Sequence, residues 1–79
     1  MPKYIIIEKP EFGMEMAILF DVLIKHSAVA AGKKVVSAGF VMFSSVGPVA
    51  YGASDGLNLV SRPQDSAIIK ESMERKTVI

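Results

Sequence analysis

Apolar positions along the chain fall into short runs, and the first two runs predict a pair of strands. Residues 3–8 are β-branched and aromatic, which is typical of a strand. Residues 14–20 form a second apolar run, and the segment from Lys9 to Gly13 between them holds a proline and a glycine, which favour a loop. Because this connection is short, we expect the two strands to pair as an antiparallel hairpin.

A second hairpin is predicted in the middle of the chain. Residues 34–43 give the strongest strand signal, and the segment from Ser44 to Pro48 reads as a turn. The chain then returns as a strand from Val49 to Ser54. After a turn or bulge at Asp55 and Gly56, extended structure is expected from Leu57 to Val60.

The segment between the two hairpins predicts a short helix. Asp21 has the carboxylate of a helix cap, residues 22–31 follow it, and Gly32 is a plausible left-handed stop. An alternative stays open, in which residues 22–24 extend the second strand and the helix covers only residues 27–31.

The last predicted element is a helix over residues 62–75. It begins at Ser61-Arg62-Pro63-Gln64, which supplies a capping hydroxyl, a first-turn proline and a glutamine three residues after the serine. Glu71 and Arg75 have the spacing of a favourable ion pair, and residues 76–79 read as a tail. The stripe expected to face the core is Ala67, Ile68, Ile69, Ser72 and Met73.

These elements predict one α+β domain over residues 1–79. We expect a small, mostly antiparallel four-stranded sheet built from two hairpins, in the order ββαββα, with the C-terminal helix packed on it. A domain of 79 residues has a thin stability margin, and it contains no cysteine and a single histidine, so disulfides and metal clusters cannot staple it. Either an unusually apolar core or a partner subunit must therefore complete it, and the apolar fraction of 51% permits both.

Two of the predicted strands are apolar on both faces, which is the most informative anomaly. A half-exposed antiparallel strand should alternate apolar and polar residues, yet neither face of residues 35–43 is polar, and residues 4–7 repeat the pattern. The two helices cover both faces only if they lie on opposite sides of the sheet. Otherwise loops cover the second face of a monomer, or a second chain does. We expect a homodimer, with an interface formed by Phe40 and Met42 and with Tyr4 or Tyr51 nearby.

Candidate chemistry is sparse, and we expect no catalytic, cofactor-binding or metal site. His26 is the single imidazole, and no nucleophile elbow surrounds any serine. The glycines at 47, 52 and 56 lack the strand-to-helix context of a phosphate loop, so they read as turns. Asp55 and Asp65 could meet as a carboxylate pair, but a turn residue and a first-turn helix acid explain them better.

The charge pattern leaves a second functional class open. With a formal net charge of +1, the chain is far from the balance of a typical nucleic-acid binder. The alternative is a small nucleic-acid-associated module, in which basic turns lie beside aromatic side chains of the sheet. Its basic residues are Lys9, Lys33 and Lys34, and its aromatic residues are Tyr4, Phe40, Phe43 and Tyr51.

Targeting signals are missing from the sequence. The N-terminal apolar run is too short for a signal peptide, and no run approaches the 18 residues of a membrane span. Together with the lack of cysteine, this predicts a cytoplasmic protein that makes no membrane contact.

Several segments carry a resemblance to short, uncharacterised proteins of bacterial and phage genomes. These are residues 36–41, 51–54 and 61–65, with Leu57 and Leu59. The resemblance covers about the last two-thirds of the chain, and it implies a phage-related context without an activity. We therefore expect a non-catalytic, homodimeric domain that binds another protein.

Overall fold

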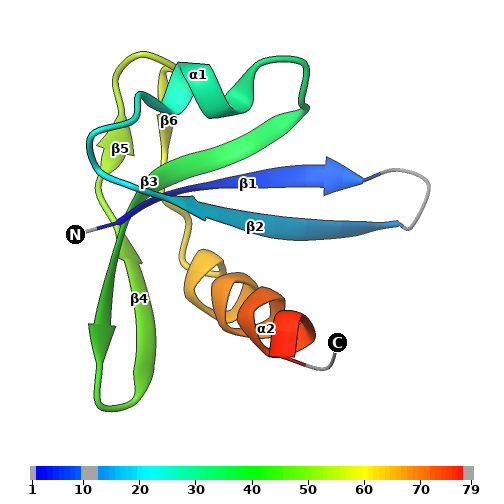
Figure 1. Cartoon of the computed structure of the whole chain (residues 1–79), viewed down its shortest axis with the longest axis vertical. Helices are drawn as coiled ribbons and strands as arrows, with labels where there is room; N and C mark the ends of the chain where they lie inside the picture. Colours follow the sequence, from blue (N-terminus) through cyan, green and yellow to red (C-terminus); the bar gives the residue numbers. More distant parts are fainter. Residues whose placement is uncertain (1, 10–12, 78–79) are drawn as a thin grey trace.

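The fold is built around one twisted antiparallel sheet (Figure 1). The structure is a computed structural model and describes residues 2–9 and 13–77. Four strands form the sheet in the order β2-β1-β3-β4, and they comprise β1 (Lys3–Lys9), β2 (Met14–Phe20), β3 (Val35–Ser44) and β4 (Gly47–Tyr51). The register pairs Lys3 with Phe20 on one side and with Phe40 on the other, and both predicted hairpins are confirmed.

Two helices and a second small sheet complete the chain. Helix α1 (His26–Ala30) precedes β3, and helix α2 (Asp65–Thr77) follows the two-stranded sheet of β5 (Ala53–Ser54) and β6 (Leu59–Val60). The predicted α+β class, with a four-stranded antiparallel sheet and a C-terminal helix, is confirmed. The order ββαββα is incomplete, because Gly52, at a φ of 78°, turns the chain out of β4 and splits the strand predicted over residues 49–54.

Both faces of the sheet are covered within one chain, which explains the apolar pattern of β1 and β3. Helix α2 covers one face, where Tyr4, Ile6, Ala17, Val41 and Ile69 form a buried cluster. On the other face, helix α1 and the residues around β6 cover a second buried cluster of Ile5, Ile7, Ala30 and Ala38. The helices therefore lie on opposite sides of the sheet, as Figure 1 shows.

The segment before α1 differs from both predicted alternatives. The Asp21 side chain does not cap the helix, because its Oδ1 accepts a hydrogen bond from the Leu23 amide at 2.8 Å and closes a local turn. Residues 22–24 belong to this turn, and the helix begins only at His26. Gly32 has a φ of 74°, so the predicted left-handed stop after the helix is confirmed.

The start of α2 lies later than predicted because an acid replaces the expected cap. The Asp65 carboxylate reaches back to accept the Arg62 amide at 3.0 Å, so Arg62 and Asp65 take the positions expected for Ser61 and Gln64. In the core-facing stripe, Ile69 and Ser72 are buried, whereas Ala67 is exposed. The side chain of Arg75 and residues 78–79 lie outside the described part, so the pairing of Glu71 with Arg75 stays a prediction.

Helix α2 also protects the two edges of the sheet. The Ala17 amide of β2 donates to Ser72 Oγ at 2.9 Å, and the Ala50 amide of β4 donates to Ser66 Oγ at 2.9 Å. Pro48 has no amide hydrogen to offer on β4. A strand added to either edge of the sheet would therefore meet an amide that already donates a hydrogen bond to a serine of α2.

Candidate functional site

His26 stands at the centre of an aromatic cluster on the α1 side of the sheet. Its ring meets Phe20 and Phe40 edge-on, at centroid distances of 5.4 and 5.8 Å, and Phe40 stacks on Tyr51 at 5.9 Å. The buried His26 Nε2 lies 2.8 Å from the Gly39 carbonyl oxygen. Since a carbonyl only accepts, we assign a hydrogen to Nε2, and Nδ1 is the second polar atom of the ring.

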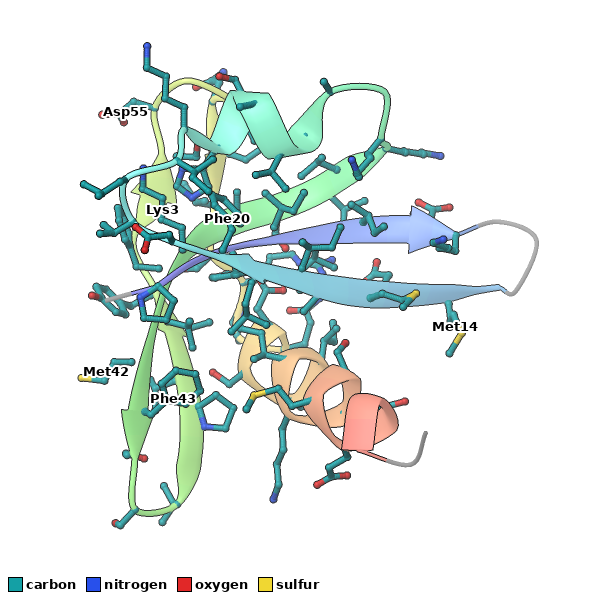
Figure 2. The ribbon with its side chains drawn as sticks, in the orientation of Figure 1. Lys3, Met14, Phe20, Met42, Phe43 and Asp55 are labelled. Carbon is teal, nitrogen blue, oxygen red and sulfur yellow. The ribbon has the colours of Figure 1, made fainter. Side chains whose placement is uncertain are left out.

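A pocket opens beside this cluster, and we call it the α1 pocket. It has a volume of about 350 Å³, close to the lower end of ligand-binding cavities. Charged and hydroxyl side chains are mixed with small and aromatic ones on its walls, and Figure 2 shows Lys3 and Asp55 on this side of the molecule. The lining residues are Lys3, Lys25, His26, Ser27, Phe40, Ala53, Ser54, Asp55 and Gly56.

The hydroxyl of Ser54 is the unexplained atom of the α1 pocket. Ser54 is 3% exposed, and its Oγ has no hydrogen-bond partner among the described residues. A buried hydroxyl without a partner costs about 1–3 kcal/mol, so such atoms in a folded protein call for a physical explanation. Ser37 Oγ, under the opposite face, is in the same state but lines none of the described pockets.

The α1 pocket brings a histidine, two serines and an aspartate together, but not in hydrolytic geometry. Nucleophilic catalysis needs a serine within hydrogen-bond reach of the histidine, and an acid that orients the ring from the other side. Ser54 is buried without a partner, and the Nε2 of His26 bonds a backbone carbonyl. In residues 2–9 and 13–77, no three His, Cys, Asp or Glu side chains group as metal ligands.

A second polar cluster lies under α2, and it holds the helix to the sheet. The Tyr4 hydroxyl donates to Asp65 Oδ2 at 2.6 Å, and Arg62 Nε donates to Asp65 Oδ1 at 3.0 Å. The same guanidinium reaches Glu15 on β2 at 2.8 Å. Both Tyr4 and Asp65 are fully buried. This network was not predicted from the sequence. The one feature that pointed to a role for Asp65 was its position in the first turn of the helix.

The four predicted interface residues lie in different surroundings. Tyr4 is fully buried inside its own chain, and Phe40 and Tyr51 pack on each other beside His26. Only Met42 is largely exposed, and its neighbour Phe43 is 53% exposed. Figure 2 shows both side chains on the part of β3 beyond its pairing with β1.

Met42 and Phe43 belong to a larger exposed surface at one end of the sheet. Because Lys3, the first residue of β1, pairs with both Phe20 and Phe40, the segment after β2 and the last residues of β3, which pair with β4, lie beyond the same end of β1. A groove lined by Pro2, Leu19, Phe20, Asp21, Val22 and Phe43 joins them. We call this surface the apolar end, and its exposed residues are Val22, Leu23, Ile24, Met42, Phe43 and Val46.

The predicted nucleic-acid residues do not come together. Lys34 pairs with Glu8 at 3.5 Å, and Lys33 Nζ donates to the Val29 carbonyl. These lysines lie at the start of β3, whereas Phe40 lies six residues further along, about 20 Å away at roughly 3.3 Å per residue. The basic turn and the aromatic side chains therefore occupy opposite ends of the strand.

Comparisons with protein-family models, with curated proteins and with solved structures gave no match. Among the described residues, no helix has the length and apolar character needed to cross a bilayer.

Proposed function

We propose that this chain is a small, non-catalytic interaction domain that forms a homodimer through its apolar end. One observation carries the proposal, namely the concentration of large exposed apolar side chains at one end of the sheet. Leu23 is 89% exposed and Val46 is 84% exposed, and one groove is lined by both Val22 and Phe43. Contiguous apolar surface of this kind is typical of protein–protein contact sites.

The size of the apolar end supports a second copy of the chain as its occupant. At roughly 150–200 Å² for a large, fully exposed side chain, its six residues present on the order of 600 Å². A standard interface buries about 800 Å² on each partner, so two apolar ends with their polar rims would suffice. A twofold contact needs a self-complementary patch. Because the net charge is only +1, electrostatic repulsion between two copies of the chain is weak.

The sheet edges support a contact between side chains rather than strand pairing. Ser66 and Ser72 already accept the central amides of β4 and β2. Met42 and Phe43, in contrast, project from opposite faces of β3 in a part of the strand that extends beyond β1. The proposed interface therefore still includes Met42, as the sequence predicted, but it is centred on Phe43 instead of Phe40.

The proposal includes a cytoplasmic location, since a chain without cysteine suits a reducing compartment. The resemblance to bacterial and phage proteins gives it a phage-related context. A further protein partner would then bind a dimer, on surfaces away from the apolar end.

The oligomeric state can be measured by light scattering coupled to size exclusion at low micromolar concentration. We expect the wild type at twice its chain mass of 8.5 kDa and Phe43→Lys at the chain mass. Val60→Lys is the matched control, because Val60 is also exposed and apolar but lies on β6. It should stay dimeric.

Circular dichroism keeps this test interpretable, since each variant must show the wild-type spectrum before its mass is compared. A monomeric wild type would end the proposal. If Phe43→Lys and Leu23→Lys are both folded and dimeric, the dimer exists but does not use the apolar end.

A further inference from the structure

We propose that the α1 pocket binds a small organic anion, whose carboxylate or phosphate group is held between Lys3 and Lys25. The pocket lies on the α1 side of the sheet. Three features of its walls support the assignment, and each concerns a different part of the ligand.

The first feature is a pair of lysines whose charges are not compensated. The Lys3 ammonium donates to the Ile24 carbonyl at 3.0 Å, which fixes it beside the segment that carries Lys25. Across residues 2–9 and 13–77, neither Nζ forms an ion pair with a carboxylate. Two such cations on one pocket favour a ligand with a localised negative charge.

The second feature is the buried polar floor. Ser54 Oγ is almost fully buried and has no partner among the described residues, although Ser54 lines the pocket. The bond between His26 Nε2 and the Gly39 carbonyl fixes the imidazole ring, so its Nδ1 is held in one orientation. Because Ser54 Oγ exposes almost no surface, the side chain must turn about its Cα–Cβ bond to meet a ligand oxygen in the pocket, which would give it the hydrogen bond that it lacks.

The third feature indicates an organic ligand instead of a bare inorganic ion. Phe40 and Ala53 provide apolar wall, and the volume of about 350 Å³ exceeds what one small ion needs. Asp55, at the rim, opposes a second negative charge and would accept a hydrogen bond from a hydroxyl or ammonium group of the ligand. The favoured ligand therefore carries one anionic group and an apolar part.

Amide chemical shifts of the ¹⁵N-labelled full chain test this assignment with three probes. Benzoate and phenyl phosphate each carry an anionic group on a ring, and benzyl alcohol is their neutral counterpart. We expect saturable shifts at Lys3, at residues 25–27 and at residues 53–56 with at least one anion. Tighter binding of benzoate would indicate a carboxylate ligand, and tighter binding of phenyl phosphate would indicate a phosphate ligand. Benzyl alcohol should bind at least tenfold more weakly.

Charge-reversal and blocking variants separate this pocket from general charge attraction. Lys25→Glu should weaken the anion at least tenfold, whereas Lys70→Glu, an equal charge change on an exposed position of α2, should leave its affinity within twofold. A Cβ at Gly56 would meet no atom within 4 Å, so Gly56→Leu should keep the fold and obstruct the pocket. Linear, unsaturable shifts, equal binding of benzyl alcohol, or equal losses in both lysine variants would overturn the proposal.

Discussion

Gly39 makes two contacts, and one of them leaves no room for a side chain. Its carbonyl oxygen accepts the hydrogen bond from His26, and a Cβ at this position would lie 2.5 Å from the Tyr51 carbonyl oxygen. Gly39 admits the end of β4, where the chain turns away at Gly52.

Replacing Gly39 by alanine should consequently destabilise the fold. The contact is with backbone, which cannot move aside as a flexible side chain would, and we expect a loss of about 1–3 kcal/mol in the free energy of unfolding. Gly56→Ala is the control, since its Cβ would meet nothing within 4 Å and its effect should stay within about 0.5 kcal/mol. Urea unfolding of both variants measures this, and equal midpoints would contradict it.

The Tyr4 hydroxyl gives the stability a dependence on alkaline pH. Burial, followed by the hydrogen bond to Asp65, raises the pKa of Tyr4 far above its ordinary value of 10.0. The unfolded chain therefore loses the Tyr4 proton near pH 10, whereas the folded chain keeps it. The resulting contribution to stability is complete below pH 10 and is lost as the pH rises above it.

We expect the free energy of unfolding to fall by about 1.4 kcal/mol per pH unit above pH 10 because of this residue. Tyr4→Phe removes the titrating group, so its stability should fall less steeply over the same range, even though it starts lower. Urea titrations of both proteins between pH 8 and 11 compare the slopes. Parallel curves would show that Tyr4 titrates alike in the folded and unfolded chains.

Elements that follow from local residue type were predicted well. Residues 14–20 were predicted as a strand and form β2 over the same range, because apolar runs flanked by turn residues need no distant contact to specify them. The start of α2 was placed too early, because the Asp65 carboxylate replaces the hydroxyl of Ser61 as the local partner. That preference depends on the contact with Tyr4, 61 residues away, which the sequence around Ser61 does not reveal.

The α1 pocket was beyond prediction for a related reason. His26, Phe40 and Asp55 were each noted in the sequence, but separately. Their meeting depends on the register between β1 and β3 and on the turn at Gly52, which folds β5 back beside the start of α1. Spacing along the chain carries no signal of such a long-range arrangement.

Helix α2 has a narrower buried face than its sequence indicates. Introducing aspartate at a buried position and at an exposed position of the helix tests this. Ile69 is fully buried, so Ile69→Asp places an unpaired carboxylate in the core and should cost at least about 3 kcal/mol. Ala67 was predicted on the same stripe but is exposed, and Ala67→Asp adds an acid near the helix start, where the change should stay within about 0.5 kcal/mol. Comparable thermal midpoints would mean that α2 is rotated.

At the scale of the whole molecule, the two helices decide whether a partner is needed for folding. Strands that are apolar on both faces raise the possibility that a second subunit completes the core. Here α2 closes one face, and α1 with the β5–β6 sheet closes the other. Apart from Val60 and Met73, the large apolar side chains that stay exposed lie at the apolar end, beyond the packed part of the sheet. A dimer formed there adds a contact to a core that is already complete.

Dissociation of the proposed dimer should therefore not unfold the chain. In an obligate dimer the monomer lacks a core, so mass and secondary structure are lost together on dilution. Here we expect serial dilution to halve the mass seen by light scattering while the far-UV circular dichroism per residue stays constant. Phe43→Lys should match the diluted wild type in its urea midpoint, because Phe43 lies outside both buried clusters. If ellipticity falls in step with mass, the second subunit completes the core after all, and the two clusters on the faces of the sheet are insufficient by themselves.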